Sequence, residues 1–95
     1  MAGYLIAQIK VTDPAAYEAY RGAVPAVIES FGGRYLVRGG ELDMKEGSSE
    51  FQRMVVLEFP SADKAREFYH SPVYQEILPL RLAASAGTVS IVEGV

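Results

Sequence analysis

Residues 4–11, Tyr-Leu-Ile-Ala-Gln-Ile-Lys-Val, constrain the fold most, because they predict a strand with apolar side chains on both faces. One face carries Leu5, Ala7, Ile9 and Val11. Tyr4 and Ile6 add apolar surface to the other face. A strand of this kind is covered on two sides, so the fold has to supply a layer on each face of its sheet.

The rest of the composition narrows the class of protein. A chain of 95 residues fits one domain, which we place at residues 1–95, and 49% hydrophobic residues suffice for one core. The absence of cysteine excludes disulfides and thiol chemistry. A net charge of −3 without a basic run argues against nucleic-acid and membrane partners. No leader or membrane span is apparent, so we expect a cytoplasmic protein.

Three capping signals predict helix starts. Asp13-Pro14 begins a helix whose apolar stripe runs from Tyr17 to Phe31, with a kink or restart at Pro25 and an end at Gly32-Gly33. Ser61 begins a second helix. Ser71-Pro72 begins a further helical segment, which we expect to be interrupted near Pro79 and to continue weakly to residue 86.

Three more strands complete the pattern, at residues 34–38, 53–59 and 88–92. Gly39-Gly40 predicts a bulge after the first of them. The acidic connection over residues 41–50 lacks the ligand spacing of a calcium loop and indicates an exposed hairpin end.

The resulting order is βαββαβ with a split second helix. Right-handed crossovers then give a ferredoxin-like plait of the α+β class, a four-stranded antiparallel sheet of order 4-1-3-2 with helices on one face. Because the strands are apolar on both faces, the uncovered face needs a partner. A second copy packed sheet to sheet, as a homodimer, meets that need.

Several segments carry a family resemblance that spans nearly the whole chain. The most specific is residues 32–40, Gly-Gly-Arg-Tyr-Leu-Val-Arg-Gly-Gly, joined by Asp13-Pro14, residues 58–61, residues 69–74 and the ending at residues 92–94. With these, the chain resembles the bacterial family called domain of unknown function thirteen-thirty, in the dimeric α+β barrel superfamily. The resemblance implies the fold and the sheet-to-sheet dimer, and it implies no activity.

Glu58 is the first candidate for chemistry, because a carboxylate in an apolar strand has to be paired, protonated or near solvent. Arg38 and Arg34 are its natural partners on the preceding strand. If the hairpin pairs residues whose numbers sum to 94, Arg38 lies opposite Val56 and on the same side of the sheet as Glu58. If the register shifts by one residue, Glu58 lies opposite Tyr35 instead. Two interpretations remain open: a structural ion pair, and an acid–base site in which Arg38 binds an anion.

His70 is the second catalytic candidate, since its ordinary pKa suits proton transfer near neutrality, although a surface role is the simpler interpretation. Tyr17, Tyr69 and Arg81 are candidate ligand-binding residues. The tyrosines, with Tyr20 and Tyr74, either pack as helix faces or line a pocket around Ala7. Arg81 either reaches that pocket or pairs with Glu76, and the pairing is slightly favoured.

Two functions are compatible with these residues. The first is binding of a small organic acid or aromatic metabolite, with or without cofactor-independent catalysis; the alternative is a non-catalytic homodimeric interaction module. We expect no cofactor and no metal site. The glycine pairs do not form a phosphate loop, because Gly32-Gly33 lies between a helix and a strand, the reverse of the order such loops require.

Overall fold

The computed structural model describes residues 1–95 and contains four strands and three helices. In chain order they are β1 (Gly3–Val11), α1 (Pro14–Ser30), β2 (Arg34–Glu41), β3 (Arg53–Phe59), α2 (Ala62–His70), α3 (Pro72–Ala84) and β4 (Ser85–Glu93). The strands form one antiparallel sheet in the order β2-β3-β1-β4. The predicted ferredoxin-like plait is therefore confirmed.

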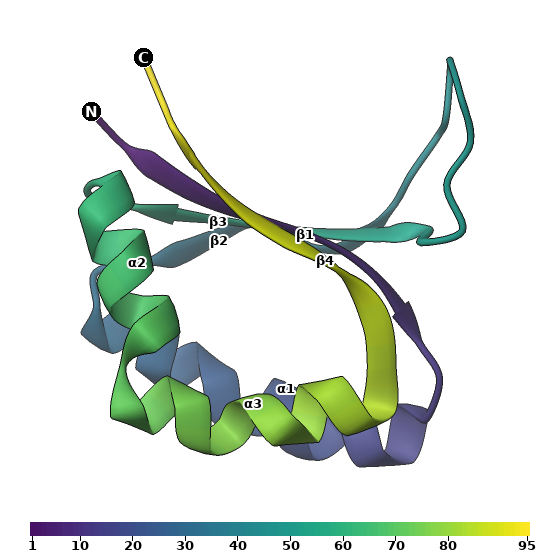
Figure 1. Cartoon of the computed structure of the whole chain (residues 1–95), viewed down its shortest axis with the longest axis horizontal. Coiled ribbons are helices and arrows are strands. Elements are labelled where there is room, and N and C mark those ends of the chain that lie inside the picture. Colours follow the sequence, from purple (N-terminus) through teal and green to yellow (C-terminus); the bar gives the residue numbers. More distant parts are fainter.

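The three helices lie on one side of the sheet, and the other side is open (Figure 1). The connection between β2 and β3 and both chain termini project toward the open side. Alternation along β1 places Leu5, Ala7 and Ile9 against the helices, where they are buried. Tyr4 and Ile6 point the other way and are only half-buried. The chain thus leaves one apolar sheet face uncovered, as the first strand predicts.

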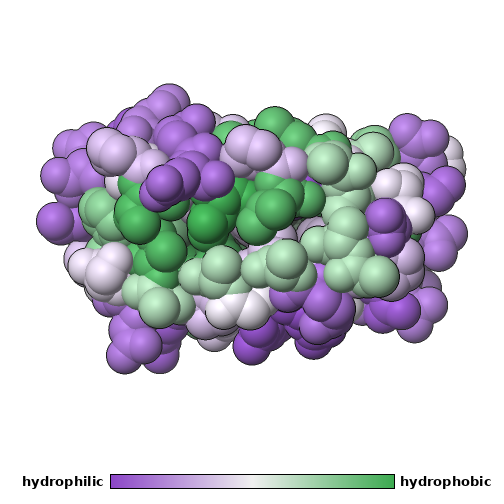
Figure 2. Space-filling model, turned by 90° about the horizontal axis from the view of Figure 1, so that it is seen from below, coloured by the Kyte–Doolittle hydropathy of each residue, from purple (hydrophilic) through white to green (hydrophobic).

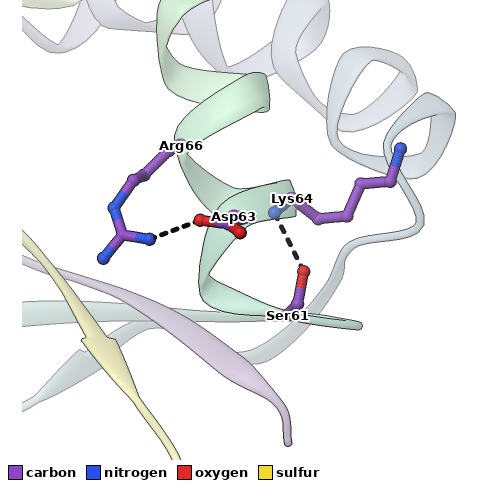
Figure 3. A network of polar contacts seen from close by, with 4 residues as sticks. All are labelled: Ser61, Asp63, Lys64 and Arg66. Atoms are coloured by element: carbon purple, nitrogen blue, oxygen red, sulfur yellow. Dashed lines mark hydrogen bonds and ion pairs between the residues drawn. The ribbon is translucent and has the colours of Figure 1, made fainter.

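The predicted capping residues begin all three helices. The side chains of Asp13, Ser61 and Ser71 accept hydrogen bonds from the backbone N–H groups three residues later, at 3.1, 3.1 and 3.2 Å. At the start of α2, Asp63 also pairs with Arg66 at 2.8 Å, on the surface of the molecule (Figure 3). These local signals fix where each helix begins.

The helix interiors differ from expectation at two prolines. Neither Pro25 nor Pro79 interrupts its helix, so the predicted restart of α1 and the predicted break in α3 are both wrong. Each proline removes one backbone donor. Burial of neighbouring residues, Val24 and Ile28 in α1 and Leu78 in α3, keeps each helix continuous where this hydrogen bond is missing.

The start of the last strand also differs from expectation. The last strand begins at Ser85 rather than at Thr88, because Ser85 through Gly87 pair with the end of β1. At the other sheet edge, the predicted bulge is present, with Gly39 at φ +75° and a register shift between Arg38 and Gly40. A second register shift lies between Tyr35 and Val37, where no glycine in the sequence predicts it.

The packed core lies where α2 meets the sheet. Phe59 and Phe68 are fully buried, with ring centroids 5.2 Å apart, and Phe68 stacks on Tyr74 at 4.5 Å. On their outer surface, α1 and α3 carry an apolar patch surrounded by hydrophilic residues (Figure 2). Its exposed members on α3 include Val73 and Leu80.

Candidate functional site

A cavity of about 370 Å³ separates the sheet from α1 and α3. The sheet contributes an apolar wall that includes Leu5, Ala7, Val55 and Leu57. The helices contribute tyrosines and arginines. A volume of this size falls in the range of small-molecule sites, which are mostly apolar with a few polar groups. The cavity is therefore the strongest candidate for a functional site.

Four tyrosines line the cavity: Tyr17, Tyr20, Tyr35 and Tyr74. The hydroxyls of Tyr20 and Tyr74 are hydrogen-bonded at 3.0 Å and buried. Burial raises the pKa of Tyr17, Tyr20 and Tyr35 above the ordinary value of 10. These hydroxyls thus stay protonated at neutral pH and can donate hydrogen bonds to a ligand.

Arg81 is the most unusual residue of the cavity. It lies in the last turn of α3, is only 7% exposed and lines the cavity wall. No ion pair or side-chain hydrogen bond joins its guanidinium to another group of the protein, and Glu76 is not its partner. Since no fully buried polar side-chain atom lacks a partner, the guanidinium nitrogens are open to the cavity. Its positive charge partly offsets the effect of burial on the pKa of Tyr17 and Tyr20, so it lies near both phenols.

The helix geometry explains why Arg81 points inward. Tyr74, Leu78 and Arg81 are spaced by four and three residues, which places them on one face of a continuous helix. All three are buried. Because α3 continues through Pro79, Arg81 stays in phase with the apolar residues before it. A break at Pro79 would have released it from that face.

Three further arginines line the cavity: Arg21, Arg38 and Arg53. Arg21 is 3.4 Å from Glu18, which is the one carboxylate in the lining. Arg53 lies 3.5 Å from the carbonyl of Gly39. The Arg38 guanidinium lies over the ring of Tyr35, 4.7 Å from its centroid. Four arginines against one carboxylate make the cavity positive in a chain whose net charge is −3.

Glu58 lies outside this cavity. Its carboxylate accepts from Arg34 Nε at 2.8 Å and pairs with Arg34 Nη2 at 2.7 Å. The observed register places Glu58 opposite Arg34, which neither register considered from the sequence predicts. The slipped register is present only at Val37 and Arg38, where Arg38 lies opposite Val55, and the other register only at Gly40 and Glu41. Glu58 and Arg38 therefore project from opposite faces of the sheet, and a combined site of the two is not formed.

His70 and Tyr69 also lie outside the cavity lining. His70 is exposed at the end of α2, where its ring meets the edge of Tyr69 at 5.3 Å. Tyr69 is half-buried and packs against Tyr74, with centroids 5.5 Å apart. Of the candidates named from the sequence, the structure brings Tyr17, Arg38 and Arg81 together around one space. Whether they bind a ligand stays a prediction.

Three lining residues, Tyr35, Arg21 and Arg53, were not proposed from the sequence. Arg21 had a detectable signal, since it follows Tyr17 by four residues on the same helix face. Tyr35 and Arg53 depend on the register of the β2–β3 hairpin, which two shifts obscure. No group of three or more His, Cys, Asp or Glu side chains is placed to hold a metal ion. None of the helices has the length and apolar character needed to cross a bilayer.

Fold and cavity together define a ferredoxin-like α+β protein with a cation-lined pocket between sheet and helices. The chain belongs to the family described as Domain of unknown function (DUF1330), which matches residues 2–95. No curated protein of known function matches the sequence.

Solved structures show the same fold at low identity. A protein of unknown function from Rhodopseudomonas palustris has a TM-score of 0.79 and 21% identity, with 99% of this chain and 82% of that chain covered. SnoaB, a cofactor-independent oxygenase from Streptomyces nogalater, has a TM-score of 0.65 and 14% identity, with coverage of 99% and 93%. A dimeric ferredoxin-like protein of unknown function from Thermobifida fusca has a TM-score of 0.64 and 15% identity, with coverage of 98% and 91%.

Proposed function

We propose that this protein binds a small organic acid with an apolar or aromatic body in the cavity between its sheet and helices. The observation that carries the proposal is Arg81, a residue only 7% exposed that lines the cavity and whose guanidinium forms no ion pair within the protein. No fully buried polar side-chain atom lacks a partner, so the Arg81 nitrogens are accessible from the cavity, and no counter-charge of the protein neutralises them. An anionic ligand would supply that counter-charge.

The remaining lining suits such a ligand. A guanidinium can donate two parallel hydrogen bonds to a carboxylate, and this interaction is stronger in a partly enclosed cavity than in bulk water. The Tyr17 hydroxyl lines the same space and can donate to a further ligand oxygen. In the Tyr20–Tyr74 pair, the hydroxyl that accepts from the other keeps its own donor for the ligand. The apolar wall around Ala7 accommodates the rest of the molecule.

Catalysis without a cofactor is compatible with this arrangement. The cavity can hold and stabilise an anionic form of its ligand through Arg81 and the tyrosine hydroxyls. SnoaB, which shares the fold, is described as a cofactor-independent oxygenase. Within the cavity Glu18 is the only carboxylate, and it lies beside Arg21. We therefore place binding first and leave Glu58 and His70 outside the proposed site.

The proposal includes a homodimer formed through the open sheet face. That face carries apolar side chains on all four strands, among them Ile6, Val37, Val56 and Val92. Val37 and Val92 are exposed in the single chain. Similar folds described as dimeric support the assignment. Nucleic acid and membranes are not among the proposed partners, and a cytoplasmic location is part of the same proposal.

A thermal-shift experiment tests the binding proposal. Aromatic and aliphatic carboxylates, with 2-naphthoate as the reference, would be added to the wild-type protein, to Arg81→Met and to Arg66→Met. Arg66 is a matched control because it is a surface arginine paired with Asp63 and does not line the cavity. We expect 2-naphthoate to raise the melting temperature of the wild type and of Arg66→Met, and to leave Arg81→Met unchanged.

Two outcomes would count against the proposal. If no carboxylate in a broad set stabilises the wild type, the interaction module becomes the better account. If carboxylates stabilise Arg81→Met as much as the wild type, they bind elsewhere, and Arg81 has no part in binding.

A further inference from the structure

Arg38 and Arg81 form two separate cationic positions in one cavity. Both line it, but they come from different layers, Arg38 from β2 in the sheet and Arg81 from α3. β2 is one edge strand, and α3 leads directly into β4, the other edge strand. With about 4.8 Å between neighbouring strands, the two edges are roughly 14 Å apart. The two guanidiniums therefore approach the cavity from opposite sides.

The effects of the two arginines on the pKa values of nearby tyrosines indicate the same separation. Arg81 acts on the pKa of Tyr17 and Tyr20, whereas Arg38 acts on that of Tyr35. Arg21 influences both Tyr17 and Tyr35, so it lies between the two positions. Arg21 already has Glu18 as a neighbour. Arg38, Arg53 and Arg81 have no carboxylate partner. Arg53 donates to the Gly39 carbonyl at 3.5 Å, which leaves Arg38 and Arg81 as the two without a polar side-chain contact in the protein.

Arg38 is held in a geometry that leaves its donors free. Its guanidinium stacks over the Tyr35 ring, 4.7 Å from the centroid. This cation–π contact restrains the position of the group without using its N–H donors for a hydrogen bond. No side-chain hydrogen bond to another protein group uses them. A guanidinium held in place and without an ion pair is available to bind an anion such as a carboxylate.

On the sheet side, the lining between the two cations is mainly apolar, and Arg21 lies between them on the helix side. Leu5, Ala7, Val55 and Leu57 of the central strands form the wall that separates them. A ligand with a single acidic group would satisfy Arg81 and leave Arg38 unused. A longer molecule would meet both.

We infer that the natural ligand carries an acidic group at each end of an apolar body, one bound by Arg81 and the other by Arg38. This inference rests on the proposed function and makes it more specific. It names the chemical class as an elongated dianion, of which an apolar dicarboxylate is the simplest example.

Paired probes with one or two carboxylates test the inference. The rigid pair is 2-naphthoate and 2,6-naphthalenedicarboxylate, and the flexible pair is nonanoate and azelate. Dissociation constants would be measured by titration calorimetry on the wild type, Arg38→Met, Arg81→Met and the control Arg66→Met. In the wild type, we expect the better-fitting dicarboxylate to bind about fivefold or more tightly than its monocarboxylate partner.

The variants separate the two ends of the cavity. Arg38→Met should abolish the advantage of the second carboxylate and leave the affinity for the monocarboxylate unchanged. Arg81→Met should weaken both probes of a pair, and Arg66→Met should weaken neither. Arg38 and Arg66 are exposed, so their variants are expected to fold normally.

Each other result has a defined meaning. Equal affinity for mono- and dicarboxylates in the wild type, or an advantage that survives in Arg38→Met, would overturn the two-ended ligand while the binding proposal stands. Failure of all four probes to bind the wild type would instead count against both.

Discussion

The two faces of the sheet handle charge and apolar surface in opposite ways. Helices cover one face of the sheet, but side chains do not fill the space between helices and sheet. The cavity there contains arginines without carboxylate partners. The open face has exposed apolar side chains, and the carboxylate of Glu58 on β3 forms an ion pair with Arg34. Unpaired charge beside a cavity points to a small ligand. Paired charge beside exposed apolar surface points to another protein surface, here a second copy.

The largest effect should come from a charge placed on the open face. Val56 lies on β3 between Ile6 and Val37, so Val56→Lys would bury an unpaired ammonium in the proposed interface. We expect the dimer to weaken by about 3 kcal/mol, or roughly a hundredfold, measured by light scattering across a dilution series.

The outer helix surface supplies a matched control for this variant. Val92 on the open face and Val73 on α3 are both 46% exposed. Val92→Lys should weaken the dimer, whereas Val73→Lys should leave its mass unchanged. A dimer sensitive only to Val73→Lys would place the interface on the helices instead.

The next effect contrasts two buried alanines on the covered side. Ala65 lies in the packed core, whereas Ala7 borders the cavity. Ala65→Leu should lower the free energy of unfolding by about 1–3 kcal/mol, because the core has no room for the added carbons. Ala7→Leu should change it by less than about 1 kcal/mol and block ligand binding. Urea denaturation and calorimetry would measure these effects, and equal destabilisation by both would mean that the cavity is closed in solution.

Alkaline pH should lower the free energy of unfolding through Tyr20, which lies on the helix-covered side of the sheet. Burial raises the pKa of Tyr20 above 10, so above pH 10 the unfolded chain releases this proton while the folded chain retains it. Stability is therefore fully present below pH 10 and falls as the pH rises further. Tyr20→Phe should reduce that fall by at most about 1.4 kcal/mol per pH unit, measured by denaturation between pH 9 and 11. An unchanged pH dependence would show that the Tyr20 hydroxyl is accessible to solvent.

The smallest effect should come from Glu58. Its partner Arg34 is 70% exposed at the side chain, so the pair behaves as a surface ion pair. Glu58→Gln should lower the free energy of unfolding by less than about 1 kcal/mol and leave carboxylate affinity unchanged. A loss of ligand binding in this variant would contradict this assignment and show that Glu58 takes part in binding.

The architecture followed from local signals in the sequence because those signals act over a few residues. Asp13, Ser61 and Ser71 cap their helices, and Gly32 ends α1 at φ +77°. The two-sided apolar pattern of β1 then requires a layer on each face.

The site depended on longer-range geometry. The face on which Arg38 lies is set by two register shifts, one of them at Leu36, where no turn residue marks it. The direction of Arg81 depends on whether α3 tolerates Pro79, which tertiary packing decides. The cavity itself arises because α1 and α3 pack on each other without filling the space beneath the sheet, and no residue pattern encodes an unfilled volume.

The most direct test of the central claim is the coupling between ligand charge and Arg81. Calorimetry would give dissociation constants for 2-naphthoate and its neutral analogue 2-naphthamide, each with the wild type and with Arg81→Met. If Arg81 binds the carboxylate, the charged ligand should lose tenfold or more in the variant, about 1.4 kcal/mol, while the amide loses little. Unliganded Arg81→Met should be about as stable as the wild type, because Arg81 makes no ion pair that the variant would lose. Equal losses for both ligands, or none for either, would contradict the assignment of the cavity as an organic-acid site.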